Sequence, residues 1–386
     1  MESNFYSDKE NEGDFPQAFE DYLSARLEGN LQGLNLSEEE FEYVLDRLVE
    51  EELQEEVLEL SQIAFEKYPY SLHLLTRLCD TLVITGNPQK AIEMLESYSD
   101  SFNASSAIYL LFSRANIAQG QYNHARDYFY KALECTDGES DTMESVCALA
   151  QDCIDFGNHS EALYYLTKAQ KLGTLPYEYL NDIAFCHVRL DNPGMAEEYY
   201  NKYLDNNPFN DTVWFNMGTV AARMHNFDKA IEAFEYSIAL NSGNASSLYN
   251  LAVVYMNLER YANAAEVFEQ FNAIDPDELG RLGLGESYIR LRRWEEARMQ
   301  FESILPGSDK ANEARAGLSS LDAILCLNGA DGMEDSVQSR AQERFKELFM
   351  DILNNGTAWL GVVYDMLPQL QHQDWFLQFL ESIKKQ

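Results

Sequence analysis

The sequence contains few residues that break helices: its 386 residues include only 9 prolines and 20 glycines. A chain of many short strands would need turn residues every few positions, so this scarcity favours long helices. Hydrophobic residues make up 46% of the chain and aromatic residues 12%. That is enough apolar material for a packed core, which argues against an intrinsically disordered chain.

Motifs that carry chemistry are also missing. The cysteines form no Cys-x-x-Cys pair and the histidines form no His-Glu-x-x-His motif, so neither a disulfide framework nor a zinc site is indicated. No Gly-x-Ser-x-Gly nucleophile elbow is present either. We therefore expect no cofactor, no metal and no catalytic centre, and a reducing, cytoplasmic environment. The six cysteines are Cys79, Cys135, Cys147, Cys153, Cys186 and Cys326.

Basic residues are scarce, since 28 Lys and Arg face 65 Asp and Glu, which gives a formal charge of −37. Such a charge repels phosphate backbones and anionic lipids, so we expect no nucleic-acid partner and no membrane partner. The imbalance is strongest in residues 1–70, with 20 acidic against 4 basic side chains. This end is either a solvated acidic surface or an attractor for a basic partner.

Long apolar runs are absent, and no stretch approaches the ~18 continuous apolar residues of a membrane span. The first residues, MESNFYSDKENEGDF, have neither a basic start nor an apolar segment. We therefore expect no secretory signal there.

What the sequence does contain is a repeat with a period of about 34 residues. In the clearest copies an apolar residue precedes a small one, and an alanine and an aromatic residue follow at fixed spacing; the first two copies match less well. Successive copies begin at residues 38, 72, 106, 143, 177, 211, 245 and 278, with one insertion near residues 136–140. The clearest copies contain Met217, Gly218, Ala230 and Phe234; Leu251, Ala252, Ala264 and Phe268; and Leu284, Gly285, Ala297 and Phe301.

This pattern resembles the tetratricopeptide-repeat family, whose repeat has 34 residues. The resemblance covers about residues 38–310 and implies an all-α fold, a right-handed α-solenoid of about eight helix–turn–helix repeats with helical caps. Turn pairs such as Gly86-Asn87 separate the two helices of a repeat, because glycine tolerates the left-handed backbone that ends a helix. Small residues such as Gly218 let the helices approach, and aromatic residues such as Phe234 fill the space to the next repeat.

The two ends do not follow the repeat. Residues 1–37 are predicted to be an acidic segment with one short helix around residues 18–27, and residues 311–327 a capping helix. A C-terminal helical extension is expected over residues 328–386, and it begins with a break in the helix at residues 328–332. Its last helices are rich in aromatic residues, which either pack against one another or allow self-association. These aromatic residues are Trp359, Tyr364, Trp375, Phe376 and Phe379.

The family resemblance implies that a partner protein or extended peptide lies along a concave groove lined by the first helix of each repeat. The basic residues of a carboxylate clamp are absent from the matching positions, so binding of a chaperone tail by such a clamp is not expected. The early repeats carry acidic groove residues, which suggests a partner with a basic segment, whereas the later repeats carry amides and arginines. The predicted partner-binding residues are Glu42, Asp46, Asp80, Asp182, Arg189, Asn216, Arg223, Asn250, Asn257 and Arg290.

The sequence thus favours a non-catalytic scaffold or adaptor that holds another protein. Two alternatives stay open. One is a recruitment module of an enzyme, with activity in the C-terminal helices; the other is a structural protein that self-assembles through its aromatic C-terminal helices.

Overall fold

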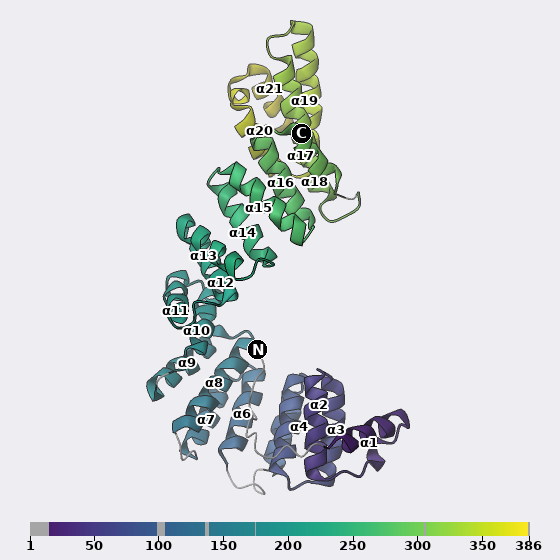
Figure 1. Cartoon of the computed structure of the whole chain (residues 1–386), viewed down its shortest axis with the longest axis vertical. Coiled ribbons are helices and arrows are strands. Elements are labelled where there is room, and N and C mark those ends of the chain that lie inside the picture. Colours follow the sequence, from purple (N-terminus) through teal and green to yellow (C-terminus); the bar gives the residue numbers. More distant parts are fainter. Residues whose placement is uncertain (1–14, 99–104, 136–138, 174, 305, 385–386) are drawn as a thin grey trace. The chain divides into compact units, whose positions relative to one another are not determined.

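The computed structural model describes residues 15–98, 105–135, 139–173, 175–304 and 306–384. These residues form α-helices, two short 3-10 helices and turns, and none of them lies in a strand. The chain divides into two compact units, residues 1–191 and residues 192–386. Figure 1 shows helices that follow one another in pairs within each unit.

The first unit contains ten α-helices among its described residues and a buried core that extends from Ala18 to Ala115. Helices α2, α4, α6, α8 and α10 are the first members of the predicted repeats, and we call them first helices; α3, α5, α7 and α9 are second helices. The bounds are α1 Pro16–Leu27, α2 Glu38–Glu50, α3 Gln54–Lys67, α4 Leu72–Ile84, α5 Pro88–Tyr98, α6 Ser106–Ala118, α7 Tyr122–Glu134, α8 Glu139–Asp155, α9 His159–Leu172 and α10 Glu178–Arg189, with the 3-10 helix Leu31–Gly33 after α1.

The second unit continues the alternation, with first helices α12, α14 and α16 and second helices α11, α13, α15 and α17. Its core joins the repeats to the C-terminal extension. The bounds are α11 Pro193–Asn206, α12 Asp211–Arg223, α13 Phe227–Leu240, α14 Ala245–Asn257, α15 Tyr261–Ile274, α16 Glu278–Arg290, α17 Trp294–Glu302, α18 Ala311–Ala330, α19 Asp335–Asn355, α20 Trp359–Met366 and α21 Asp374–Lys384, with the 3-10 helix Pro368–His372 before α21.

Side chains at the start of several first helices satisfy backbone N–H groups that have no partner within the helix. Ser37 and Glu40 form a capping box at α2, and the side chains of Ser71 and Asn210 cap α4 and α12. At the other end of α4, α6 and α8 the chain turns through a glycine with positive φ. These local signals fix where each helix begins and ends.

Packing within a pair and between successive pairs depends on small residues that face aromatic rings. A Cβ atom added at Gly218 would lie 2.7 Å from the ring of Phe234, and one at Gly283 would lie 2.3 Å from the ring of Phe268. The rings therefore occupy the space that a larger side chain would need. Both units are accordingly all-α stacks of helix pairs, the architecture of an α-solenoid.

Two boundaries differ from the sequence-based expectation. Helix α18 runs to Ala330, so Asn328 and Gly329 belong to the helix rather than to a break. Burial of Ala330 stabilises the last helical turn, and the chain reverses only at Gly332, whose φ is 74°. Helix α8 begins at Glu139, before the predicted repeat start at residue 143. Residues 1–14 of the N-terminal segment and residues 136–138 of the predicted insertion lie outside the described residues.

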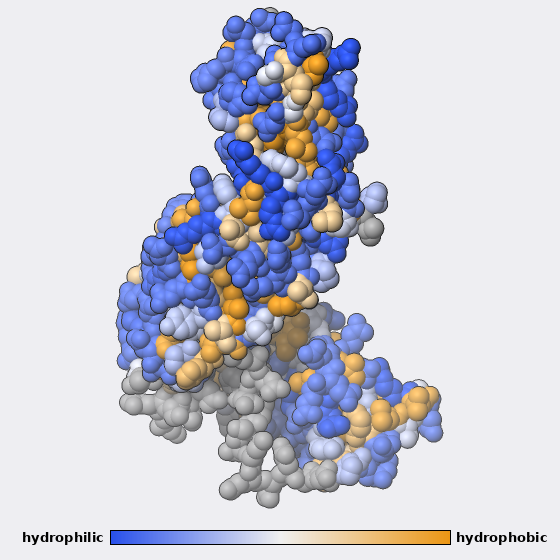
Figure 2. All heavy atoms as spheres, turned by 45° about the horizontal axis from the view of Figure 1, so that its top comes forward, coloured by the Kyte–Doolittle hydropathy of each residue, from blue (hydrophilic) through white to orange (hydrophobic). Residues whose placement is uncertain are grey.

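Figure 2 shows that hydrophilic residues cover most of the visible face, with apolar residues in narrow stripes between them. Among the described helices, none combines the length and the apolar character that crossing a membrane requires.

Candidate partner-binding surfaces

Charged side chains connect the first helices of the first unit. Arg77 on α4 pairs with Asp46 on α2. Arg114 on α6 donates to Asp80 on α4 at 2.7 Å and to Asp152 on α8 at 2.9 Å. One guanidinium group thus serves two carboxylates, which leaves an excess of negative charge between α4, α6 and α8.

Burial makes this excess costly. It raises the pKa of Asp152 to about 6 and also raises the pKa of Asp80, although Arg114 opposes both shifts. Asp152 is 7% exposed. A carboxyl group removed from water favours its neutral form unless a cation compensates it fully, and a shared cation does not.

Two further carboxylates, those of Asp182 and Asp155, have no cation beside them within the described part of the chain. Burial, with a contribution from Asp155, raises the pKa of Asp182 on α10 to about 6, and the hydrogen bond from the Asn181 amide at 3.5 Å opposes the shift only weakly. Asp155 accepts a hydrogen bond from Gln151 at 2.9 Å. The buried Oδ1 atom of Asn181 has no hydrogen-bond partner among the described residues.

Glu42 on α2 is half-buried, and burial raises the pKa of its carboxyl group, with opposing contributions from His73 and Arg77. We call the side of α2, α4, α6, α8 and α10 that carries these groups the acidic face. Its carboxylates are Glu42, Asp46, Asp80, Asp152, Asp155 and Asp182.

The sequence-based list missed Asp152 and Asp155. Both occur near the end of a predicted first helix. Asp155 is at the thirteenth position of its repeat, as Arg189 and Arg223 are in theirs, so its spacing could have revealed it; Asp152 is at the tenth position, which the family pattern does not place in the groove. Of the predicted acidic residues, Asp46 and Asp80 are held in ion pairs, whereas Glu42 and Asp182 are not.

The predicted basic residues differ in their surroundings. Arg189 is exposed, and its Nε atom donates to Nε2 of His159 at 3.3 Å. Arg223 is exposed at the end of α12. Arg290 on α16 is only 13% exposed: its guanidinium donates to Asp365 on α20 at 2.7 Å and lies 5.4 Å from the ring centroid of Tyr261. Arg290 therefore links α16 to the C-terminal extension.

The predicted amide residues of the second unit also differ from one another. The Asn250 side chain donates to the carbonyl of Ser246 within its own helix at 2.9 Å, which uses part of its donor capacity. Asn216 is half-buried on α12, and Asn257 is exposed at the end of α14. Asp182 belongs to the first unit, whereas Asn216 and Asn250 belong to the second. They are therefore parts of separate sites.

The aromatic residues of the C-terminal extension pack against one another and against the repeats. Phe376 on α21 is 1% exposed and lies 5.5 Å from Phe349 and 6.1 Å from Tyr364, measured between ring centroids. Trp359 on α20 meets Phe301 on α17 edge to face at 5.1 Å. These rings form part of the core of the second unit.

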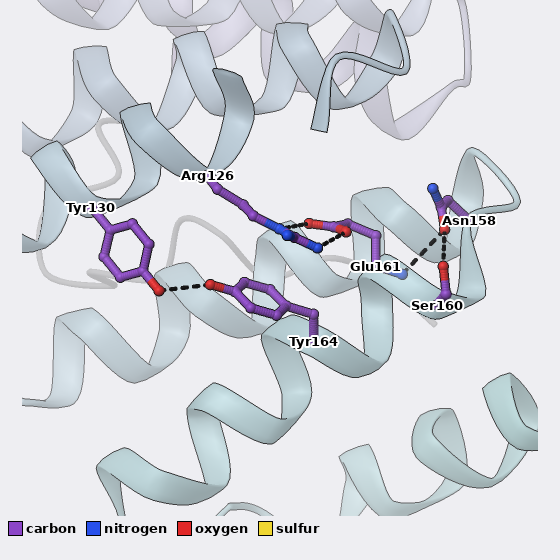
Figure 3. A network of polar contacts seen from close by, with 6 residues as sticks. All are labelled: Arg126, Tyr130, Asn158, Ser160, Glu161 and Tyr164. Carbon is purple, nitrogen blue, oxygen red and sulfur yellow. Dashed lines mark hydrogen bonds and ion pairs between the residues drawn. The ribbon is translucent and has the colours of Figure 1, made fainter. Parts of the chain in front are cut away.

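A second polar network lies on α7 and α9 (Figure 3). Arg126 donates to both carboxylate oxygens of Glu161, at 2.7 Å from Nε and 2.5 Å from Nη2. The guanidinium also lies 4.2 Å from the ring centroid of Tyr164. The Tyr164 hydroxyl is 2.6 Å from the Tyr130 hydroxyl, and the Asn158 side chain accepts from the backbone N–H of Glu161.

No grouping of three or more His, Cys, Asp or Glu side chains suited to a metal ion occurs among the residues that the structure describes.

Comparison with known proteins places the repeat within a family. A tetratricopeptide-repeat model matches residues 215–278, from α12 to the start of α16. Protein O-mannosyl-transferase Tmtc3 of Drosophila melanogaster is 32% identical over 106 residues, 27% of this chain and 11% of that protein. BBSome complex member BBS4 of Bos taurus is 24% identical over 156 residues, 37% of this chain and 30% of that protein. The matched regions thus span less than a third of either relative.

Solved structures with a similar arrangement of helices include tetratricopeptide-repeat proteins. The C-terminal part of such a protein from Cytophaga hutchinsonii has a TM-score of 0.48 at 17% identity, covering 63% of this chain and 99% of that one. YrrB, described as a tetratricopeptide-repeat protein with an unusual peptide-binding site, has a TM-score of 0.39 at 20% identity, covering 48% of this chain and 95% of that one. The family match shows that residues 215–278 carry a tetratricopeptide repeat, and paired helices of the same kind recur along the described repeats on either side of it.

Proposed function

We propose that the chain is a non-catalytic scaffold that binds an extended segment of another protein, and that basic residues of this segment lie against the acidic face. The observation that carries the proposal is the uncompensated charge there. Asp80 and Asp152 share a single arginine, and Asp182 and Asp155 have no cation beside them among the described residues. A lysine or arginine from a partner would supply the missing charge and lower the raised pKa values.

The second unit offers a different chemistry. Asn216 and Asn257 carry amide groups that can both donate to and accept from a peptide backbone, and Arg223 can bind a carboxylate. We include these residues as a separate candidate contact surface of the second unit. Arg290 and Asn250 contribute less to the proposal, because contacts within the chain already use their donors.

The alternatives have less support. Self-association through the C-terminal aromatic helices would need exposed rings, yet Phe376 and Trp359 are buried in the core. Activity in those helices would need polar groups that converge on a substrate; Arg315, Ser319 and Asn355 converge on Asp351, and their donors are thus used within the chain.

The test is binding of fluorescein-labelled nona-arginine, measured by fluorescence anisotropy at pH 7.5. We compare the double variant Glu42→Gln/Asp182→Asn with Glu232→Gln/Glu266→Gln, which removes the same charge from exposed positions of α13 and α15. The acidic-face variant should bind about tenfold more weakly, and the control should change less than about twofold, since only close charges interact strongly. Equal weakening of both variants would rule out a specific acidic-face site.

Lowering the pH provides a second test of the same site. Between pH 7.5 and 5.5 the Asp182 carboxyl, with a pKa of about 6, takes up a proton and loses its charge. Nona-arginine should therefore bind the natural chain more weakly at pH 5.5, and this loss should be smaller in a variant with Asp182→Asn.

A further inference from the structure

The second helices of the fourth and third repeats differ in charge from the others that the structure describes. The charges within α7 sum to zero and those within α9 sum to +1. In contrast, α5 carries −1, α3 carries −3, and α11, α13, α15 and α17 carry −2 each. In a chain of net charge −37, this pair is therefore the part of the second-helix surface where long-range repulsion of an acidic partner is weakest.

Three lysines on these helices have no acidic partner among the residues that the structure describes. None of the ion pairs within the described part of the chain includes Lys131, Lys168 or Lys171. Acidic residues outnumber basic ones by 65 to 28, so a nearby carboxylate would be easy to provide. Two of these lysines rest on tyrosine rings instead. The Lys131 ammonium lies 4.7 Å from the ring centroid of Tyr128. Lys168 lies 5.4 and 5.5 Å from the rings of Tyr130 and Tyr164.

A contact with an aromatic ring leaves the ammonium N–H groups able to donate. Such a contact contributes only about 0.5–1 kcal/mol at an exposed site, less than a close charge pair can supply. Lys131 and Lys168 are therefore held in place without being neutralised.

The two tyrosines beneath Lys168 are fixed before any partner arrives. Glu161, which is buried, holds Arg126 through two hydrogen bonds; Arg126 stacks on Tyr164, and Tyr164 contacts the hydroxyl of Tyr130 (Figure 3). Tyr130 is nevertheless 42% exposed. Tyrosine and arginine are enriched in the residues that dominate protein interfaces, and side chains held rigid lose little entropy on binding.

We propose that the tyrosine–lysine face, defined by Tyr130, Tyr164, Lys131, Lys168 and Lys171, is a docking surface for an acidic segment of a partner protein. The three ammonium groups and the Tyr130 hydroxyl bind carboxylates of that segment. A short peptide is favoured over nucleic acid or an anionic membrane, because an extended array of phosphates would also meet the acidic remainder of the chain. This surface lies on second helices and is independent of the acidic face on the first helices.

The experiment uses fluorescein-labelled octaglutamate as the probe, with binding followed by anisotropy in 50 mM salt. Lys131→Glu/Lys168→Glu is compared with Lys202→Glu/Lys229→Glu, which changes the net charge by the same amount on α11 and α13. We expect a Kd increase of about tenfold or more for the first variant and less than about twofold for the control. Tyr130→Phe, which keeps the ring and removes the hydroxyl, should weaken binding about threefold.

Carbodiimide cross-linking locates the probe without relying on variants, because it joins a carboxylate to a lysine amine in direct contact. Mass spectrometry should find octaglutamate on Lys131, Lys168 or Lys171. The proposal is overturned if the cross-links lie on other lysines or if both double variants weaken binding equally. It is also overturned if octaglutamate fails to bind while inorganic polyphosphate binds through these lysines, or if sedimentation shows that they join two copies of the chain. Circular dichroism confirms that each variant is folded.

Discussion

At the scale of single residues, the turn after a first helix contains a residue with positive φ, which is glycine in some repeats and a larger residue in others. Gly86, Gly120 and Gly157 have positive φ where a first helix ends. At the matching positions of other repeats Glu52, Asp191, His225, Glu259 and Arg292 adopt φ between 56° and 60°. A side chain with a Cβ atom is strained in this left-handed region.

Relieving that strain should stabilise the protein. We expect Glu259→Gly, at φ 56°, to raise the free energy of unfolding by about 0.5–1 kcal/mol, because glycine adopts this backbone without a steric penalty. Gly157→Ala, at φ 75°, is the reverse change and should lower it by about 1 kcal/mol. Urea titration measures both. A loss of stability in Glu259→Gly would mean that its side chain contributes more than the strain costs.

The acidic face predicts a stability effect that depends on pH. The pKa of Asp182 is about 6 in the folded state against 3.8 ordinarily. The folded chain therefore binds a proton more readily than the unfolded chain, so the charged carboxyl destabilises the fold above pH 6 and the penalty fades as pH falls below it. Asp182→Asn should accordingly stabilise by ~1–2 kcal/mol at pH 8, by roughly half as much near pH 5, and by little below about pH 4.

Thermal unfolding of the natural chain and the Asp182→Asn variant between pH 5 and pH 8 measures this difference. Glu232→Gln, at an exposed position, is the control and should show no such trend. A stabilisation that stays constant with pH would show that the effect arises from packing rather than from charge.

At the scale of helices, several helices at the end of the second unit pack around one aromatic ring, that of Phe301. A Cβ atom added at Gly285 on α16 would lie 2.5 Å from the Phe301 ring, and one at Gly317 on α18 would lie 2.8 Å from it. Trp359 on α20 meets the same ring edge to face. Phe301 thus joins α16, α17, α18 and the C-terminal extension into one core.

We expect Gly285→Ala to lower the free energy of unfolding by ~1–3 kcal/mol, because the added methyl group overpacks the site. Adding Phe301→Leu to this variant should cost less than the two single changes together, since each relieves the other. Gly361→Ala on α20 is the control: no atom lies within 4 Å of its added Cβ, so it should be neutral or stabilising by up to about 1 kcal/mol. Additive costs would mean that the helices move apart instead.

At the scale of the whole molecule, charge repulsion limits stability. The chain has 65 acidic and only 28 basic side chains, so many carboxylates have no cation to pair with and repel one another. Salt screens exposed charges beyond about 10 Å at 0.1 M. Raising NaCl from 20 to 300 mM at pH 8 should therefore increase the unfolding midpoint by about 2–4 °C, equivalent to ~1 kcal/mol in a unit of this size.

Circular dichroism during heating measures this shift. At pH 4, where many carboxyl groups are protonated, the effect of salt should become smaller. A midpoint that falls with salt at pH 8 would show that the ion pairs, such as those of Arg114 and Arg126, contribute more than the repulsion removes.

The sequence was most informative where the structure is local. The repeat pattern predicted paired helices and close approach at small residues such as Gly218, because such neighbours are close in the chain; that the Phe234 ring lies against Gly218 of its own repeat came from the structure. It was less informative at Asn328 and Gly329, where the helix continues through residues that usually break one. Burial of Ala330 outweighed that local preference.

By itself, the sequence determined the helical repeats and the acidic character of the chain, because both depend on residue type and on spacing along the chain. Only the tertiary structure decided which charges are neutralised. Arg114 lies between two carboxylates from different helices, Arg290 pairs with an aspartate 75 residues away, and Lys168 rests on tyrosines rather than on an acid. These outcomes depend on distances through space and on burial, which side-chain packing sets after the helices have come together.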